Sequence, residues 1–494
     1  MTDKFRCLTI VFLITTFQLL YTFYKNNFIF AYGLDDTYIH LAIAKHFAEN
    51  GVWGVTKYAF TSATSSPIYT LSLAAIIKII GNKVWIPLVL NIIVVANIFY
   101  VSSDYLYREK KPFMGDLYTL ILTLITPMPF LIVAGMEHTL HILAVILLLR
   151  AVEKENTLHI LFFSLLSVAI RYESMFLVAG LAFMYIYTER KIKLPILMLL
   201  FGAFPVFLWG FISLKNGAFF FPNPLLMKST LPSLDIAGLK IFASQVYEKL
   251  KLGMLLNCLM AWLFAYIFIS KKAEKNLIIP FALLINVLIH SILAGNFIVS
   301  RYESYLVFAV LLHSLPFMGE KIRESRSLLL FAAALIAFFP FSVRLLAAIP
   351  LTNVCVKNIY EQQIQIARFL KENYPNGKII AQDIGAIGYY TEVEMYDIMG
   401  LSSNEAIRYK HDFPALREDL QAKPHQFAML WDDNRKMGLP WKYIGKWTIS
   451  ENMICAGKDV FFFAKDTTIS RELQTKLQGF SDKHAELFEA DYSK

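Results

Sequence analysis

The sequence predicts a polytopic α-helical membrane protein of about eleven spans, followed by a C-terminal α/β domain. Three observations support this prediction. Hydrophobic residues make up 56% of the 494-residue chain, and the mean hydropathy is +0.50. Charged residues make up only 17%, whereas soluble domains average about 25%. Apolar stretches alternate with short basic loops up to residue 349, and the remainder has ordinary polarity. The composition excludes an ordinary soluble enzyme, a disordered chain and a fibre.

The net charge and the cysteine content exclude further functional classes of protein. The net charge of +9 does not indicate nucleic-acid binding, because the basic residues are scattered between apolar stretches. Four cysteines without a Cys-x-x-Cys pair exclude a disulfide scaffold and a zinc ribbon. Cys355 and Cys455 fall in the predicted external domain, where a disulfide is permitted but not required. No Walker or Rossmann glycine pattern occurs, so nothing indicates an ATP-driven pump.

The apolar stretches predict the membrane helices. The first stretch, Cys7 to Tyr24, has no small-residue cleavage site after it, so we interpret it as an uncleaved anchor. Several stretches are shorter than the roughly 20 residues of an ordinary span, which favours tilted or kinked helices. Pro127 and Pro129 predict one kink. The further spans are predicted over residues 84–101, 116–134, 137–150, 157–170, 174–188, 194–214, 252–270, 276–294, 302–318 and 327–346.

The distribution of basic residues predicts the orientation. If Lys4 and Arg6 lie inside, basic clusters at 108–111, 150–154, 190–193, 271–275 and 321–326 lie inside as well. The opposite short turns carry almost no basic residues except Arg171 and Arg301. Residues 350–494 then lie outside the cytoplasm. Residues 67–81 are apolar but short. If this segment crossed the membrane, every later loop would lie on the opposite side from the one that the basic residues predict. We therefore predict a re-entrant or interfacial segment on the outer side.

The sequence thus predicts a membrane domain over residues 1–349, with a first external loop at 25–83, and an extracytoplasmic α/β domain over 350–494. In the second domain, Ile359 to Glu372 has the pattern of an amphipathic helix that ends at Pro375-Asn376-Gly377. Strands are predicted over 378–382, 427–430, 443–449 and 459–464, and a polar helix over 468–490.

Polar residues gather at the outer ends of the predicted spans. A lone charge there costs roughly 3 kcal/mol unless it is paired or hydrated. Two interpretations are open: the residues are interface anchors and helix caps, or they line a polar cavity. For the set as a whole we favour a site. The set comprises Asp35, Asp36, Glu137, His138, Arg171, Tyr172, Glu173, Lys215, Asn216, Asn223, Lys228, Asn296, Arg301, Tyr302 and Glu303.

Asp35 and Asp36 are adjacent carboxylates that follow the first span closely. Adjacent carboxylates repel, so one of them tends to hold a proton, bind a metal or pair with a base. This arrangement suits a general base, which needs a carboxylate within hydrogen-bond reach of a hydroxyl. The alternative is that the pair caps a short helix from about Tyr38. Spacing alone slightly favours the cap.

The first external loop resembles that of GT-C membrane glycosyltransferases, and is closest to the group that includes mycobacterial arabinofuranosyltransferases. The resemblance lies in Leu-Asp-Asp-Thr-Tyr-Ile-His-Leu-Ala at 34–42, Trp-Gly at 53–54 and Thr-Ser-Ser-Pro-Ile-Tyr at 64–69. The run at 61–66 is more polar than a single Ser-Pro turn requires. Further matches are Gly135-Met136-Glu137, Arg171-Tyr172-Glu173, Pro222-Asn223-Pro224 with Lys228, Arg301, Asp383 through Tyr390, Asp397 and Gly400-Leu401.

The resemblance implies a GT-C fold and an inverting glycosyltransferase in a bacterial inner membrane. Such enzymes resemble one another in taking a polyprenyl-phosphate sugar as donor, which explains the missing nucleotide motif. The acceptor would be an extracytoplasmic glycan, lipid or protein. Asp35 would be the base and Asp36 would position the acceptor. A divalent cation, Mg²⁺ or Mn²⁺, would be held by Asp35 and Asp36.

The same resemblance implies roles for the other polar residues. Arg171, Lys228 and Arg301 are expected to bind the donor phosphate, since a guanidinium fork suits phosphate oxygens. The alternative for Arg171 is an ion pair with Glu173. The expected acceptor and supporting residues are Glu137, His138, Glu173 and Asn223.

Two other hypotheses are open from the sequence. A transporter or flippase of a lipid-linked substrate would place charges near the bilayer midplane and show symmetric halves, neither of which is visible here. A non-catalytic scaffold with the same fold is the third hypothesis, and the Asp35-Asp36 pair argues against it. The tetrapeptide Arg-Tyr-Glu-Ser occurs at 171 and again at 301, and we give the repeat no weight because chance explains it.

Overall fold

The computed structural model describes residues 2–190, 192–228, 236–272, 277–294, 301–325, 328–409, 412–431 and 439–492. Asn296, a predicted site residue, lies outside them. The chain divides into two compact units. Unit 1 comprises residues 1–21, 88–208 and 230–350, and unit 2 comprises residues 22–87, 209–229 and 351–494. One division falls after Pro350. Residues 22–87, which include most of the predicted first external loop, belong to the same unit as the C-terminal region.

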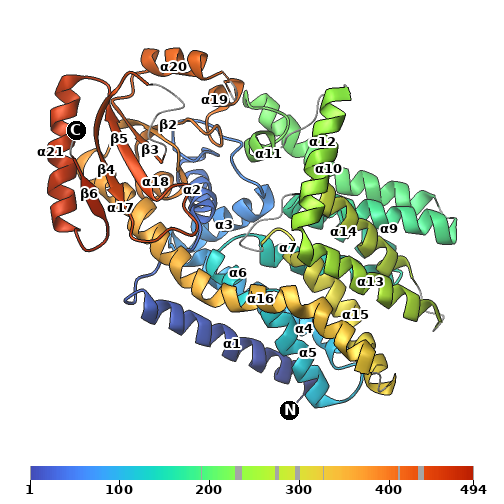
Figure 1. The fold of residues 1–494 in the computed structure, drawn as a ribbon. Coiled ribbons are helices and arrows are strands. Elements are labelled where there is room, and N and C mark those ends of the chain that lie inside the picture. The colour runs from blue at the N-terminus through green and yellow to red at the C-terminus, as the bar shows by residue number, and fades with distance from the viewer. Residues whose placement is uncertain are drawn as a thin grey trace. The chain divides into compact units, whose positions relative to one another are not determined.

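Unit 1 is built from helices, and each of the eleven predicted apolar stretches is helical (Figure 1). The stretch at 116–134 bends by 43° between α5 and α6, where Pro127 and Pro129 were expected to produce a kink. Helices α1, α10 and α16 continue into unit 2. The bounds are α1 Asp3–Lys25, α4 Ile86–Leu106, α5 Pro112–Ile125, α6 Met128–Ala134, α7 His138–Glu153, α8 Thr157–Ile170, α9 Ser174–Glu189, α10 Lys193–Lys215, α12 Ile236–Leu252, α13 Met254–Lys272, α14 Ile278–Leu293, α15 Ser304–Ser325 and α16 Leu328–Ile359.

The number of membrane-spanning helices is smaller than predicted. Within the described ranges, five helices are long and apolar enough to cross a membrane, or up to seven if each of two bent pairs is one span. The predicted count of eleven is therefore too high by this criterion. Helices α8, α9 and α14 are apolar but only 14 to 16 residues long, and an ordinary span needs about 20. These three helices were predicted correctly as apolar helices, but they are too short to be counted as membrane spans.

Helix α15 lies at the centre of unit 1. It packs against α5, α7, α13 and α14, and every residue from Ser304 to Met318 is buried. A helix that is apolar and buried all round belongs in the interior of a bundle. Its first residue, Ser304, lies beside the starts of other helices, as described below.

Unit 2 contains a mixed sheet, and four of its strands were predicted to within one residue. The short strands β2 and β6 and the helices α18, α19 and α20 were not predicted. Within the predicted segment at 67–81, Pro67–Ile80 form helix α3, and the membrane placement of this segment stays a prediction. The bounds are α2 Asp35–Asn50, α3 Pro67–Ile80, α11 Asn223–Lys228, η1 Tyr360–Ile364 (a π-helical turn), α17 Gln365–Asn373, β1 Lys378–Ala381, α18 Gly385–Tyr390, β2 Glu394–Asp397, α19 Asn404–Arg408, α20 Phe413–Ala422, β3 Phe427–Leu430, β4 Lys442–Thr448, β5 Asp459–Ala464, α21 Thr467–Lys483 and β6 Glu489–Asp491.

The strand order is β2-β1-β3-β5-β4-β6. Strand β1 pairs in parallel with β2 and β3, through Ile380 opposite Tyr396 and Ala428. The pairs β3–β5, β5–β4 and β4–β6 are antiparallel. The chain leaves β1 for β2 on one side and returns to β3 on the other. The strand order therefore reverses beside β1, and the carboxyl ends of strands at such a point commonly form a ligand site.

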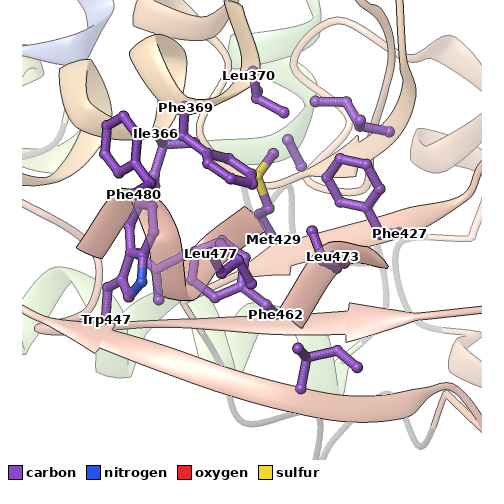
Figure 2. Packing of buried hydrophobic residues seen from close by; sticks show 14 of the residues in the cluster. Ile366, Phe369, Leu370, Phe427, Met429, Trp447, Phe462, Leu473, Leu477 and Phe480 are labelled. Carbon is purple, nitrogen blue, oxygen red and sulfur yellow. The ribbon is translucent and has the colours of Figure 1, made fainter. Parts of the chain in front are cut away.

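Helices cover both faces of the sheet. On one face, α17 and α21 pack on the strands, and Phe369, Trp447 and Phe480 meet with ring centroids 5.5 to 5.6 Å apart (Figure 2). On the other face, Leu416 and Leu420 of α20 join a second apolar cluster. Successive residues of β1 and β3 alternate between the two clusters, as the two-residue period of a strand requires. The predicted α/β character of the C-terminal region is confirmed.

Candidate functional site

The predicted site residues form two groups, one in each unit. We call Asp35, Asp36 and Asp383 of unit 2 the carboxylate cluster. We call His138, Arg171, Arg301 and Tyr302 of unit 1 the arginine cluster, together with the carboxylates that contact them.

Asp35 caps a helix, but not the helix that the sequence suggested. Helix α2 begins at Asp35 itself, and the residue before it makes no side-chain cap. The backbone N–H groups of Gly385 and Ala386 instead donate to Oδ2 and Oδ1 of Asp35, at 2.7 and 2.8 Å. These residues open α18, about 350 positions along the chain. The carboxylate of Asp35 thus fixes the start of α2 to the segment that follows β1.

Two glycines permit this close approach. A Cβ at Gly385 would lie 2.2 Å from the backbone oxygen of Asp35, and a Cβ at Gly388 would lie 2.6 Å from the backbone oxygen of Val55. Backbone atoms cannot move aside as a flexible side chain can. This explains the stretch Asp-Ile-Gly-Ala-Ile-Gly-Tyr-Tyr at 383–390, because its glycines let α18 pack directly on α2.

Asp383 joins Asp35 at the carboxyl end of β1. Burial and the Asp383 carboxylate raise the pKa of Asp35 to about 7, although the two backbone N–H groups oppose this shift. Burial also raises the pKa of Asp383 to about 6, with contributions from Asp397 and Asp36, while a hydrogen bond from Gln363 opposes it. The Nε2 group of Gln363 donates to Oδ2 of Asp383 at 3.3 Å. Gln363 lies in the π-helical turn η1, and such turns are frequent at functional sites.

Asp397 has a structural role. Its side chain is fully buried, and it accepts hydrogen bonds from the backbone N–H groups of Met399 and Ser402 at 2.8 and 2.7 Å. Gly400 lies between them with φ of +74°, which favours glycine. This tight turn gives a structural reason for Asp397 and Gly400, two of the residues in which the chain resembles GT-C enzymes.

Nothing in the described part of the chain adds to the predicted divalent cation site. Each oxygen of Asp35 accepts one backbone N–H hydrogen bond, which leaves one lone pair on each oxygen. Among the described residues, no group of three or more histidine, cysteine, aspartate or glutamate side chains is placed to hold a metal ion. We therefore derive no step through Mg²⁺ or Mn²⁺.

The polar run at 61–66 is buried and hydrogen-bonded. Oγ1 of Thr64 lies 3.2 Å from Nδ1 of His40 and 2.9 Å from Oγ1 of Thr70. Oγ of Ser62 lies 3.2 Å from Oγ of Ser213 and accepts from Nε1 of Trp209 at 3.3 Å. These contacts account for the extra polarity of the run, since buried hydroxyls need partners.

Asn223 connects three segments of unit 2. Its backbone N–H donates to Ser62, and its Nδ2 donates to the carbonyl of Leu401 and to Oδ1 of Asn404. Asn223 begins α11, and Lys228 ends it. The side chain of Lys228 lies outside the described residues, so its predicted contact with phosphate stays a prediction. Asn223 holds these segments together, and its predicted role at the acceptor stays a prediction.

In the arginine cluster, Arg171 is paired with two carboxylates. Its Nη1 donates to Oε1 of Glu137 at 2.6 Å, and its Nε and Nη2 donate to both oxygens of Glu173 at 3.2 and 2.5 Å. Arg171 is 6% exposed, and Glu137 is fully buried. The ion-pair alternative for Arg171 and Glu173 is therefore present, and Glu137 is an additional partner. This pairing leaves little positive charge on Arg171 for a phosphate.

Arg301 and Arg171 both lie against Tyr302, with each guanidinium carbon 5.0 Å from the ring centroid. Nη1 of Arg301 also contacts Sδ of Met136 at 3.1 Å. The His138 ring meets the Tyr302 ring edge-on at 5.8 Å. His138 is 2% exposed, and neither ring nitrogen has a hydrogen-bond partner within the described part of the chain.

The two Arg-Tyr-Glu-Ser tetrapeptides have the same local structure. In each, the serine begins a helix, α9 or α15, and its N–H donates to the carbonyl of the arginine three residues before it. Both turns lie at the arginine cluster. The repeated tetrapeptide was given no weight in the sequence, but its two copies form the same kind of turn in the structure.

Sequence reasoning missed several members of these groups. It gave no role to Asp383, Gln363 or Met136. The position of Asp383, shortly after a parallel strand, could have indicated it. No sequence signal marks Gln363, because the π-helical turn is not visible in the periodicity. Lys215 and Asn216 are exposed at the end of α10, and Cys355 and Cys455 form no disulfide.

Comparisons with known proteins add one finding. A domain family of unknown function, DUF8728, matches residues 357–465. The match covers less than half of the chain and includes Asp383 and Asp397 but not Asp35 or Asp36. No curated protein and no solved structure matches this chain.

Proposed function

We propose that the chain is an integral-membrane inverting glycosyltransferase of the GT-C type. It would transfer a sugar from a polyprenyl-phosphate donor to an extracytoplasmic glycan, lipid or protein. The proposal rests on the motif resemblance, on helices able to cross a membrane and on the carboxylate cluster. We further propose a bacterial inner-membrane location and an extracytoplasmic C-terminal region.

One observation carries the catalytic part of the proposal. Asp35 is oriented by two backbone N–H groups of the segment that follows β1, where the strand order reverses, beside Asp36 and Asp383. A general base works best when its pKa lies near the working pH and its geometry is fixed. The pKa of about 7 for Asp35 meets the first condition, and the two hydrogen bonds meet the second.

The reaction would run as a single displacement. Asp35 takes the proton of the acceptor hydroxyl while the hydroxyl oxygen attacks the anomeric carbon of the sugar. The bond between that carbon and the phosphate oxygen breaks, and its electron pair leaves with polyprenyl phosphate. The proton on Asp35 then passes to water. A positive group near the departing phosphate would stabilise the charge that develops there.

A transporter of a lipid-linked substrate is the second candidate, and one observation favours it. Unit 1 has polar side chains in its interior: the hydroxyl of Tyr305 donates to Oδ1 of Asn286 and lies 3.4 Å from Nδ1 of His290, and Nε2 of His141 lies 2.6 Å from Oγ of Ser174. Polar groups inside a helical bundle commonly mark a pathway.

One experiment separates the two candidates. The purified protein is reconstituted in liposomes that carry a labelled polyprenyl-phosphate sugar, with a panel of sugars and an added acceptor mixture. A transferase releases polyprenyl phosphate. A flippase moves intact donor between leaflets without cleaving it. Cleavage of any donor supports the proposal, and movement without cleavage would replace it with the transporter.

A further inference from the structure

Helix α3 of unit 2 exposes a largely apolar face. The exposed side chains of this face are Leu71, Ala75, Lys78 and Ile79. Their spacing of four, three and one residues places them on one side of a helix. Ile79 is 81% exposed, although an isoleucine normally gains stability from burial. Apolar patches on a protein surface commonly mark contacts with a partner or a membrane.

The opposite face of α3 packs on α2 and contains polar groups. Nδ1 of His40, about one turn after Asp36, lies 2.7 Å from Oγ1 of Thr70. The His40 ring also meets the Tyr69 ring edge-on at 5.5 Å. Tyr69 and Thr70 are fully buried. Helix α3 thus buries polar groups and exposes apolar ones, which is the reverse of an ordinary helix on a water-exposed domain.

The residues around the exposed face are basic. Residues 67–87 include Lys78 and Lys83 but no aspartate or glutamate. Nζ of Lys78 donates to the carbonyl of Ala48 at 3.0 Å, and the side chain stays exposed, with further N–H groups for a second contact. Trp85 is 43% exposed. Lysine and tryptophan at the edge of an apolar surface are typical of segments at the level of lipid headgroups.

The form of α3 favours the surface of a membrane over its interior. The sequence left open whether residues 67–81 are re-entrant or interfacial. A re-entrant segment has to turn back within the membrane, whereas α3 is one helix of 14 residues that is fixed to α2 along one face. It is also shorter than the roughly 20 residues of a span. An interfacial helix buries one apolar face at the headgroup boundary, and lysines beside that face attract anionic lipids.

We propose that the exposed face of α3, with Lys83 and Trp85, lies on a membrane surface that contains anionic lipid. Because α3 is fixed to α2 close to Asp35 and Asp36, this contact holds the two carboxylates at the level of the lipid headgroups. The phosphate and sugar of a polyprenyl-phosphate donor are polar and lie at that level as well. This positioning role rests on the proposed function, whereas the lipid contact does not depend on it.

The test measures where α3 lies when the full-length protein is reconstituted in vesicles of phosphatidylglycerol and phosphatidylethanolamine. An environment-sensitive fluorophore is attached at Ile79→Cys, after Cys258 and Cys455, the native cysteines that are not fully buried, have been replaced with serine. The control label is at Gly479→Cys on α21, where an added side chain meets open space. We expect the α3 label to be quenched by nitroxide-bearing lipids and the control label by aqueous iodide.

Two variants test the lipid class and the positioning role. Lipid quenching of the α3 label should decrease in vesicles of phosphatidylcholine alone, and Lys83→Gln should cause the same decrease in the anionic vesicles. Leu71→Glu should lower both the lipid quenching and donor turnover, with unchanged thermal stability in detergent because Leu71 is 44% exposed. Met453→Glu is the matched control, since Met453 is an exposed apolar residue of unit 2 outside this face, and it should change neither quantity.

Several results would overturn the proposal. An α3 label that is quenched by iodide and not by lipid nitroxide would contradict the membrane contact. A label shielded from both quenchers would replace the lipid with a second copy of this chain. Equal lipid quenching in the neutral and anionic vesicles would contradict the lipid class, and unchanged turnover in Leu71→Glu would contradict the positioning role. Lipid quenching without transferase activity in wild type would support the membrane contact and count against the proposed function.

Discussion

Replacing Arg171 with methionine tests whether the arginine cluster is held together by buried ion pairs. The substitution keeps much of the side-chain volume but leaves Glu137 and Glu173 without their common partner. Glu137 is fully buried, and the side chain of Glu173 is 23% exposed. Removing one partner of a buried pair typically costs about 3–5 kcal/mol. We expect Glu137 to account for most of this, since water can partly solvate Glu173.

The assay is unfolding of the purified protein in detergent, followed by tryptophan fluorescence during a denaturant titration. Arg171→Met should lower the free energy of unfolding by about 3–5 kcal/mol. Adding Glu137→Gln should recover a large part of that loss, because the orphaned charge is removed. Arg150→Met, which breaks a more exposed pair with Asp104, is the control and should cost about 1 kcal/mol or less. A loss under about 1 kcal/mol for Arg171→Met, or no recovery with Glu137→Gln, would refute the reasoning.

Three further predictions concern unit 2. Gly385→Ala should destabilise the protein by about 1–3 kcal/mol, because the new Cβ meets the backbone of Asp35, whereas Gly479→Ala, with open space, should be neutral or stabilising in the same thermal scans. Burial raises the pKa of Asp397 from 3.8 to about 6, so the stability linked to its protonation is present below pH 3.8 and is lost as pH rises through 6. Asp397→Asn should therefore flatten the profile of unfolding free energy against pH in this range. A profile that stays the same in the variant would contradict the shift. Burial lowers the pKa of His425 from 6.5 to about 4, so its contribution to the free energy of unfolding is present above pH 6.5 and is lost as pH falls through 4. If the stability of His425→Gln declined toward pH 4 as much as that of wild type, this result would argue against the shift.

The helices and most strands could be predicted because their signals are local. Apolar character and length predicted the helices of unit 1 except α12, which was not predicted, and alternation predicted β1, β3, β4 and β5. Strands β2 and β6 are three or four residues long and carry charged residues, so no local pattern distinguishes them from loops. The span count was too high because apolar character was given more weight than helix length.

The sequence could predict which residues belong to the candidate site, but not which groups they contact. The sequence drew attention to Asp35, Arg171 and Arg301 as unusual polar residues, and each lies in one of the two clusters. The partner of Asp35 comes from a segment about 350 residues away, and its two donors are backbone N–H groups, which have no sequence signature. Long-range contacts of this kind appear only once the chain is folded.

The central claim is that Asp35 acts as base in transfer from a lipid-linked donor, and donor turnover tests it most directly. Wild type, Asp35→Asn and Asp36→Asn would be compared with a panel of polyprenyl-phosphate sugars, with Asp397→Asn as a matched control. Thermal stability would be checked for each variant, and EDTA would test wild type for metal dependence. The account predicts that wild type releases polyprenyl phosphate and that Asp35→Asn is slower by about 100-fold or more. Full turnover by a stable Asp35→Asn variant would contradict it.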